Sequence, residues 1–173
     1  MMKKYLAGLL LAMVVTGAGA VDGYKGVKFG SSFDDLQSAK LCNFERASRQ
    51  PDNKNVVLYN CMNFQFADSN TMAAASFIDG KFVKLQIIVD PPLDPILKAL
   101  YNKYGTPSSL STKDDIQNAA VTGNPVYIRF DNGTVFLKAE KVNKIDVVSL
   151  NYVSPDFESS IEQQQVHKIA DDI

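Results

Sequence analysis

The sequence has few of the side chains that most catalytic and metal sites use. Its 173 residues include no tryptophan, two cysteines and one histidine, His167. A serine triad needs a histidine base, and zinc takes its ligands mainly from cysteine and histidine, so neither site is expected. His167 lies among glutamines, where we expect it to face solvent. We therefore predict no catalytic residues, no metal ligands and no cofactor.

Carboxylates are the remaining candidates for chemistry. A glycosidase acting on cell-wall sugars needs two of them, and the candidates are Asp34, Asp35, Glu45 and Asp90. Adjacent carboxylates early in a helix also complement the helix dipole, and the chain has no tryptophan to stack sugar rings. Two further pairs lack the spaced loop that a calcium site uses: Asp114 with Asp115, and Asp171 with Asp172. A small carboxylate-dependent hydrolase is therefore kept only as an alternative.

Charge is nearly balanced and is scattered along the chain. There are 18 basic and 19 acidic residues, which give a formal net charge of -1. A protein that binds nucleic acid usually carries a basic patch that neutralises phosphates. We therefore expect no nucleic acid among the partners.

The first twenty residues have the three parts of a secretory signal peptide. Lys3 and Lys4 precede an apolar stretch, and the small residues Ala18-Gly19-Ala20 follow it. The apolar run is shorter than the roughly 20 residues that a membrane-spanning helix needs, and no later stretch is apolar enough to span. We predict cleavage after Ala20 and a soluble periplasmic or secreted product without a membrane span.

Export gives the two cysteines a specific role. Cys42 and Cys61 flank a polar loop between two strand-like segments, and paired thiols persist as disulfides in oxidising compartments. A reactive dithiol usually has the spacing C-x-x-C near a helix start. We therefore predict a structural Cys42–Cys61 disulfide that stabilises the fold by about 3 kcal/mol.

The first half of the mature chain predicts a short strand, a helix and then four strands. Ser32, with Asp35 three residues on, can cap a helix after Gly30, and strand-like segments follow at residues 42–48 and 55–67. Residues 72–89 contain the hairpin turn signal Asp79-Gly80. A simple two-residue turn there puts Ala74 and Ser76 on one face with Val83 and Leu85.

The second half predicts a helix at residues 94–104, with Pro95 at its first position and Gly105 after its end. A polar linker at about residues 108–124 follows and is expected to be mobile. The turn signal Asn132-Gly133 then predicts a hairpin, in which Phe130 pairs with Val135, Ile128 with Leu137 and Val126 with Ala139.

The other face of this second hairpin is a candidate binding surface. It carries Tyr127, Arg129 and Phe136 beside Asp131 and Lys138. Aromatic and arginine side chains are enriched at protein contacts, so Tyr127, Arg129 and Phe136 are the predicted partner contacts. The alternative is that Tyr127 and Phe136 lie beneath the C-terminal helix or the linker.

The order of elements predicts an α+β fold, with an antiparallel sheet that has helices packed on one face and one disulfide. Three segments are expected: a signal peptide at residues 1–20, an α+β domain at 21–154, and a C-terminal helix or tail at 155–173.

Two stretches resemble small exported envelope proteins. The segment "LKALYNKYGTP" from Leu97, followed after a gap by "VYIRFDNGTVFL", is similar to the helix and hairpin of SmpA/BamE-like proteins. The glycine-then-helix segment "VKFGSSFDDLQSA" resembles the opening of such domains and of exported bacterial or phage proteins. The chain departs from the outer-membrane-assembly members in having no lipidated cysteine at its predicted mature start. The resemblance implies an envelope-located interaction domain.

Together these features predict a periplasmic binding protein without catalytic activity, whose partner is another envelope protein. An inhibitor or immunity-type protein that acts on an envelope enzyme is the concrete version of this hypothesis. A structural or assembly accessory of the envelope is the first alternative, and the carboxylate-dependent hydrolase is the second.

Overall fold

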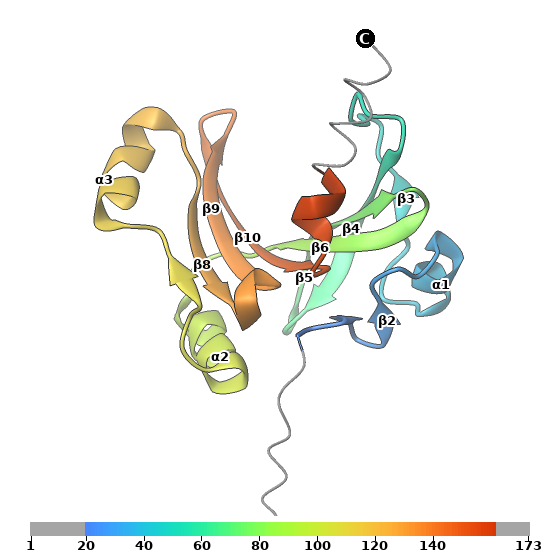
Figure 1. The fold of residues 1–173 in the computed structure, drawn as a ribbon, viewed down its shortest axis with the longest axis horizontal. Helices are drawn as coiled ribbons and strands as arrows, with labels where there is room; N and C mark the ends of the chain where they lie inside the picture. Colours follow the sequence, from blue (N-terminus) through green and yellow to red (C-terminus); the bar gives the residue numbers. More distant parts are fainter. Residues whose placement is uncertain (1–19, 162–173) are drawn as a thin grey trace, which may run out of the picture.

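The computed structural model describes residues 20–161, so the predictions for His167 and for the leader before Ala20 lie outside the described residues. An eight-stranded antiparallel sheet in the order β3-β4-β5-β6-β10-β9-β8-β7 forms the molecule, as Figure 1 shows. Its strands are β3 (Glu45–Arg46), β4 (Val56–Phe66), β5 (Ser69–Ile78), β6 (Lys81–Ile88), β7 (Ser109–Leu110), β8 (Val126–Phe130), β9 (Val135–Val142) and β10 (Ile145–Val153). The α+β prediction is confirmed.

The sheet is curved, and its outer face holds the hydrophobic core. Helices α1 (Phe33–Ser38) and α2 (Asp94–Tyr104) lie on this side, together with the small hairpin of β1 (Gly23–Tyr24) and β2 (Val27–Lys28) (Figure 1). Leu36 from α1 and Leu100 from α2 are buried there, and Tyr101 of α2 packs edge-on against Phe130 of β8. Helices α1 and α2 thus pack on the same face of the sheet, as the sequence predicted.

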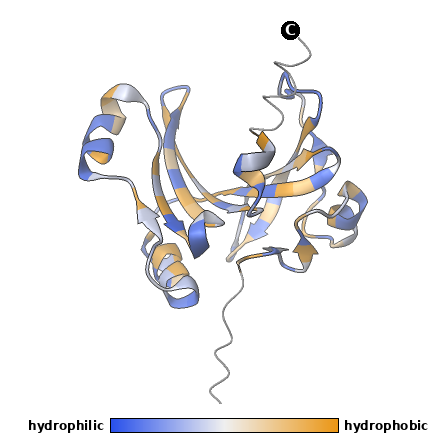
Figure 2. Ribbon diagram, viewed as in Figure 1, coloured by the Kyte–Doolittle hydropathy of each residue, from blue (hydrophilic) through white to orange (hydrophobic). Residues whose placement is uncertain are grey.

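Apolar and polar residues alternate along the strands because the core lies against one face of the sheet. Figure 2 shows this alternation along β9 and β10, and Val135, Leu137 and Leu150 belong to the core. All three predicted pairs of the second hairpin are present: Phe130 with Val135, Ile128 with Leu137 and Val126 with Ala139. Their agreement reflects a turn at Asp131–Gly133 that leaves the flanking register intact.

The predicted register of the first hairpin is wrong. Phe77 pairs with Phe82, but Ser76 pairs with Lys84, so Val83 is an extra residue that forms a β-bulge. Because side chains alternate with a period of two, one extra residue reverses the face of everything beyond it. Ala75 and not Ala74 therefore pairs with Leu85 on the core side, and Lys84 turns to the opposite face together with Ser76.

The segment predicted to be a mobile linker is largely ordered structure. It contains β7 and the helix α3 (Lys113–Thr122). Thr112 caps this helix by accepting from the backbone N–H of Asp115, whose carboxylate accepts from the Thr112 N–H in return. Gly123 ends the helix in the left-handed conformation. The prediction missed α3 because the helix has no buried residue, so its sequence lacks the apolar periodicity of a packed helix.

The predicted disulfide and the predicted helix cap are both present. Cys42 and Cys61 form a disulfide with Cα atoms 6.3 Å apart, which joins the segment before β3 to β4. Ser32 and Asp35 form the predicted capping box at the start of α1. After β10 the chain turns back and residues 157–161 are helical, in front of the inner face of the sheet (Figure 1).

Candidate functional site

The inner face of the sheet, opposite the core, is the candidate site. Strand pairing places one row of side chains straight across six strands of this face: Arg129, Phe136, Asn151, Gln86, Ala74 and Asn60. A second row carries Tyr127, Lys138 and Ser149. A third carries Val153, Lys84 and Ser76. The inner face therefore combines aromatic rings, cations and amides where the outer face is apolar.

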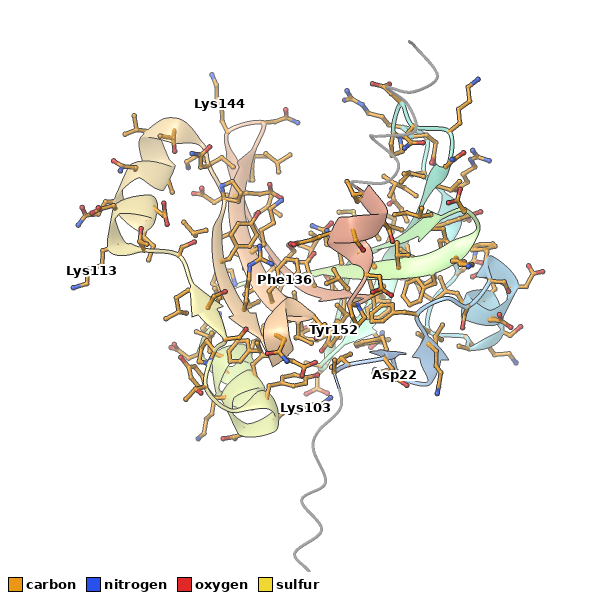
Figure 3. The ribbon with its side chains drawn as sticks, in the orientation of Figure 1. Asp22, Lys103, Lys113, Phe136, Lys144 and Tyr152 are labelled. Carbon is orange, nitrogen blue, oxygen red and sulfur yellow. A yellow bond between two sulfur atoms is a disulfide. The ribbon has the colours of Figure 1, made fainter. Side chains whose placement is uncertain are left out.

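Arg129 is held between two aromatic rings. Its guanidinium carbon lies 4.3 Å from the ring centre of Tyr127 and 4.7 Å from that of Phe136. The two rings are 5.9 Å apart in an edge-to-face arrangement. Figure 3 shows Phe136 on the inner side of the sheet, and it is only 6% exposed. The three predicted contact residues thus form one cluster, the Arg129 stack.

No carboxylate neutralises Arg129 within residues 20–161, because none lies within 4 Å of its guanidinium. An arginine fork matches a carboxylate with two parallel hydrogen bonds. Stacking on rings orients the fork without using its N–H donors. The Arg129 stack therefore presents an oriented cation whose hydrogen-bonding capacity is left for a ligand.

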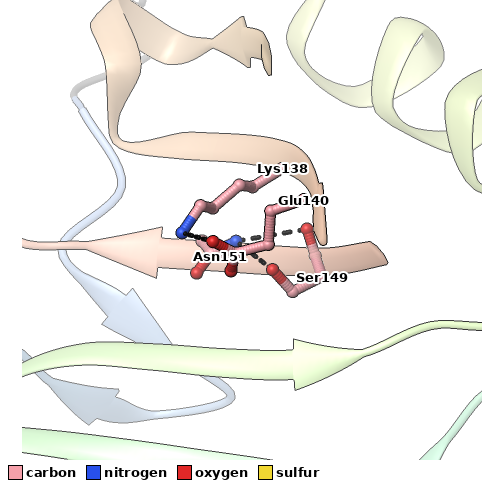
Figure 4. Close-up of polar contacts among 4 residues, drawn as sticks. All are labelled: Lys138, Glu140, Ser149 and Asn151. Atoms are coloured by element: carbon pink, nitrogen blue, oxygen red, sulfur yellow. Dashed lines mark hydrogen bonds and ion pairs between the residues drawn. The ribbon is translucent and has the colours of Figure 1, made fainter. Parts of the chain in front are cut away.

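Next to the stack is a compact polar cluster from β9 and β10, drawn in Figure 4. Lys138 and Glu140 form a half-buried ion pair of 2.6 Å. The Asn151 amide donates to the Ser149 carbonyl at 3.1 Å and to the Ser149 hydroxyl at 3.0 Å. Asn151 is fully buried, and its side-chain oxygen has no hydrogen-bond partner among the described residues. Leaving this buried oxygen without a partner destabilises the fold by about 1–3 kcal/mol.

Lys84 is the third cation of this face. Its pKa is lowered to about 8, chiefly by burial and also by the nearby Lys138, while Glu140 partly opposes both effects. Its ammonium lies 5.7 Å from the ring centre of Phe157, which comes from the chain after β10. Lys84 reaches this position only because the bulge at Val83 turns it away from the core.

A cavity of about 710 Å³ opens between the Arg129 end of the inner face and the chain after β10. Ser108, Arg129, Asn132, Phe157 and Glu158 are among its lining residues. Its size is within the range of ordinary ligand-binding clefts. A partner group entering this cavity would meet the Arg129 fork at its wall.

Sequence reasoning placed Tyr127, Arg129 and Phe136 on one face but missed Lys84, Ser149 and Asn151. Lys84 depends on a bulge that the turn signal does not reveal. Asn151 does carry a signal, because it is a polar residue between Leu150 and Tyr152 in a strongly apolar strand. Its fixed place in the alternation could have assigned it to the Arg129 face.

The carboxylate candidates lie away from the Arg129 stack. Asp34 and Asp35 are on α1, Glu45 is on β3 and Asp90 follows β6. Hydrogen bonds from Ser32 hold the pKa of Asp35 below its ordinary value. Among residues 20–161, no three His, Cys, Asp or Glu side chains gather closely enough to hold a metal ion. None of the helices in that range has the length and hydropathy to cross a bilayer.

Comparison with known proteins gives relatives without an assigned activity. A family model described as "Uncharacterised protein" matches residues 24–172. An uncharacterised protein of Haemophilus influenzae is 32% identical, and the match covers 98% of each chain. An uncharacterised protein of Pasteurella multocida is 29% identical over 68% of this chain and 63% of its own. No solved structure matches the chain.

Proposed function

Because the chain belongs to the family of uncharacterised proteins whose model covers residues 24–172, its function must be argued from the inner face itself. We propose that the protein is exported to the envelope and acts there by binding another protein. The inner face is its contact surface, and the bound element is a protruding segment of the partner that carries a carboxylate group.

The unpaired Arg129 is the observation that carries this proposal. An arginine stacked on two rings, with no anion beside it in residues 20–161, is incomplete until a carboxylate arrives. Lys84 and Lys138 add positive charge to the same face, where Glu140 pairs with Lys138 and Glu158 lines the cavity beside Arg129. Charge complementarity therefore favours an acidic partner segment.

The shape of the sheet supports a protruding partner element rather than a flat one. The face is curved inward (Figure 1), and its central residues Phe136, Ser149 and Asn151 are buried. A loop, a strand or a chain end fits such a concave face better than a flat surface does, and Tyr127 and Arg129 keep part of their surface exposed for contact. The inner-face amides Gln86 and Asn60 supply neutral hydrogen-bonding groups along the path.

The export part of the proposal draws on the leader pattern and on the disulfide, which is typical of oxidising compartments. The resemblance to SmpA/BamE-like envelope proteins is a further argument of the same kind. An inhibitor of an envelope enzyme is the concrete version of this function. An assembly accessory is its alternative.

Paired affinity capture tests the proposal. Oxidised protein carrying residues 21–173 is immobilised and exposed to an envelope extract, in parallel with the variant Arg129→Gln and the control Lys113→Gln, which removes an exposed cation from α3. We expect one protein to be retained by the unaltered chain and the control, and at least tenfold less by Arg129→Gln. Equal retention by the unaltered chain and by Arg129→Gln would contradict the proposed contact surface.

The same experiment separates the two versions of the function. If the retained protein is an enzyme and its activity falls in proportion to the amount bound, the inhibitor version is supported. If it is a component of an envelope assembly without such activity, the accessory version is supported.

A further inference from the structure

The amino end of the described chain is fixed to a turn far away in the sequence. The backbone N–H of Val21 donates to a carboxylate oxygen of Asp131 at 2.6 Å, across 110 positions. The Val21 side chain packs against the hydrophobic core. One residue on, the carbonyl of Asp22 accepts from the N–H of Phe29 at 2.8 Å. The segment is therefore positioned by backbone and side chain together.

The Asp131 carboxylate is itself held in place. The same oxygen accepts from the hydroxyl of Thr134 at 2.5 Å, and that hydroxyl also donates to the Asp131 carbonyl at 2.8 Å. Asp131, Asn132 and Gly133 all have left-handed backbone conformations, with φ values of 50°, 55° and 92°. Glycine adopts this region freely, and asparagine and aspartate are enriched there. The turn thus aims a carboxylate at the Val21 nitrogen.

That nitrogen is the atom that becomes the new amino terminus if the leader is cut after Ala20. Ala20 is exposed, so the bond is accessible. Hydrolysis breaks the bond between the Ala20 carbonyl carbon and the Val21 nitrogen; water supplies the hydroxyl of the Ala20 carboxyl group and a proton to the nitrogen. The resulting amine takes up one more proton near neutral pH.

We infer that Asp131 is the binding site for the ammonium group that leader removal creates at Val21. In the precursor the uncharged Val21 N–H donates to the Asp131 carboxylate; in the mature chain the same contact becomes an ion pair between two charged groups, which adds their Coulomb attraction. Processing would therefore lock the amino-terminal segment onto the β8–β9 turn. This inference rests on the export part of the proposed function.

Other charged groups surround this site from several elements. Asp22 is paired with Lys28 of β2 at 3.3 Å. The cavities next to Ala20 and Val21 are also lined by Lys81 of β6, Arg129 of β8, and Asp156 and Glu158 of the chain after β10. Asp131 is distinguished from these by its direct bond to the Val21 nitrogen.

The ion pair should raise the pKa of the Val21 amine above the ordinary range of about 7.7–8.0. A group whose pKa is raised on folding contributes stability that is complete below its unfolded pKa. That stability is lost as the pH rises through the folded value. The window for this effect begins at about pH 8 and extends upward.

The test uses the full chain, expressed with its own leader and purified after export. Mass spectrometry should find Val21 at the amino terminus. An NMR titration of the Val21 amine should give a pKa about one unit above the ordinary value, and Asp131→Asn should return it to the ordinary value. Asp156→Asn, which alters a neighbouring carboxylate, should leave it raised.

A chain that begins at Ala20 is a second probe in case Asp131→Asn does not fold. It keeps Asp131 but moves the ammonium one residue away, so its amine should titrate normally. A mature chain that starts at another residue, or amine pKa values that do not depend on Asp131, would overturn the inference. Failure of the partner capture would leave this titration unchanged, so the two proposals fail separately.

Discussion

Lys84 is half-buried and Asn151 is fully buried, and both reduce stability. A lysine whose pKa falls to about 8 is less stable as a cation in the folded protein than in the unfolded chain. The Asn151 oxygen has no partner to compensate its burial. Residues that lower stability commonly persist where function needs them. Both lie on the face that we propose as the contact surface.

Replacing Lys84 by methionine should stabilise the protein at pH 7. The ordinary lysine pKa is 10.5 and the folded value is about 8. Between these values the unfolded chain binds more protons, so the free energy of unfolding rises with pH, and the full penalty applies below pH 8. We expect Lys84→Met to gain about 1–2 kcal/mol at pH 7, after allowing for partial exposure, and much less at pH 10.

Urea denaturation at pH 7 and pH 10 measures this difference. Lys81→Met is the matched control, because Lys81 is an exposed lysine on the same strand, and it should change the midpoint little at either pH. A loss of stability in Lys84→Met at pH 7 would show that Lys84 contributes to the fold instead of opposing it.

The face of the sheet on which a residue lies could be predicted where it depends only on a nearby turn. Tyr127, Arg129 and Phe136 share a face because they flank one tight turn, and simple alternation from that turn assigns them correctly. Lys84 was beyond the same reasoning, since the Val83 bulge reverses the alternation. The cavity beside Arg129 depends on the chain after β10, which the sequence pattern did not position.

At the scale of elements, α1 and α3 have the same cap but different burial. Ser32 with Asp35, and Thr112 with Asp115, make equivalent pairs of hydrogen bonds. Leu36 anchors α1 in the core, whereas α3 has no buried residue and leaves Val121 88% exposed. The loss of each cap should therefore have a different consequence.

Removing the cap of α1 should weaken the whole domain. Ser32→Ala is expected to lower the global free energy of unfolding by about 1 kcal/mol, because α1 unfolds together with the core. Chemical denaturation followed by circular dichroism measures this change. A fall in the midpoint caused equally by Thr112→Ala would contradict the distinction between the two helices.

Removing the cap of α3 should act locally. Thr112→Ala is expected to leave the global midpoint nearly unchanged but to speed hydrogen exchange of the α3 amides by about fivefold, the factor that corresponds to about 1 kcal/mol. Amides of β9 and β10 serve as internal reference. Unchanged exchange in α3 would show that the cap contributes nothing there.

The elements that the sequence predicted well are those whose apolar pattern points into the core, such as α1, α2 and the second hairpin. The helix α3 was missed because its signals, a cap at Thr112 and Gly123 at its end, stand without an apolar stripe. A cap marks where a helix can begin. Only a helix with a buried face shows a regular apolar pattern in its sequence, by which it can be predicted.

At the scale of the molecule, the disulfide ties one end of the sheet. Cys42 and Cys61 are 19 residues apart, and closing a loop of that length should stabilise the fold by about 3 kcal/mol. The double variant Cys42→Ala with Cys61→Ala should lose that amount in urea denaturation. Reductant should lower the stability of the unaltered protein to the same degree and leave the variant unaffected.

Thiol titration checks the same bridge directly. The denatured, unreduced protein should contain no free thiol, and two free thiols would contradict the predicted pairing.

The fold class was accessible from sequence because hairpin signals and one-sided alternation require an antiparallel sheet with helices on one face. The curvature that forms the inner face was not accessible, since it arises from twist and bulging summed over eight strands.

Photo-crosslinking tests whether the inner face is the contact surface for a partner. A photoreactive phenylalanine analogue replaces Tyr127, which contacts Arg129, or Val121, which is exposed on α3. We expect a single envelope protein to be crosslinked from position 127. Arg129→Gln should abolish this product, and position 121 should not form it. Equal crosslinking from both positions, or a product at position 127 that persists without Arg129, would contradict the proposed contact surface.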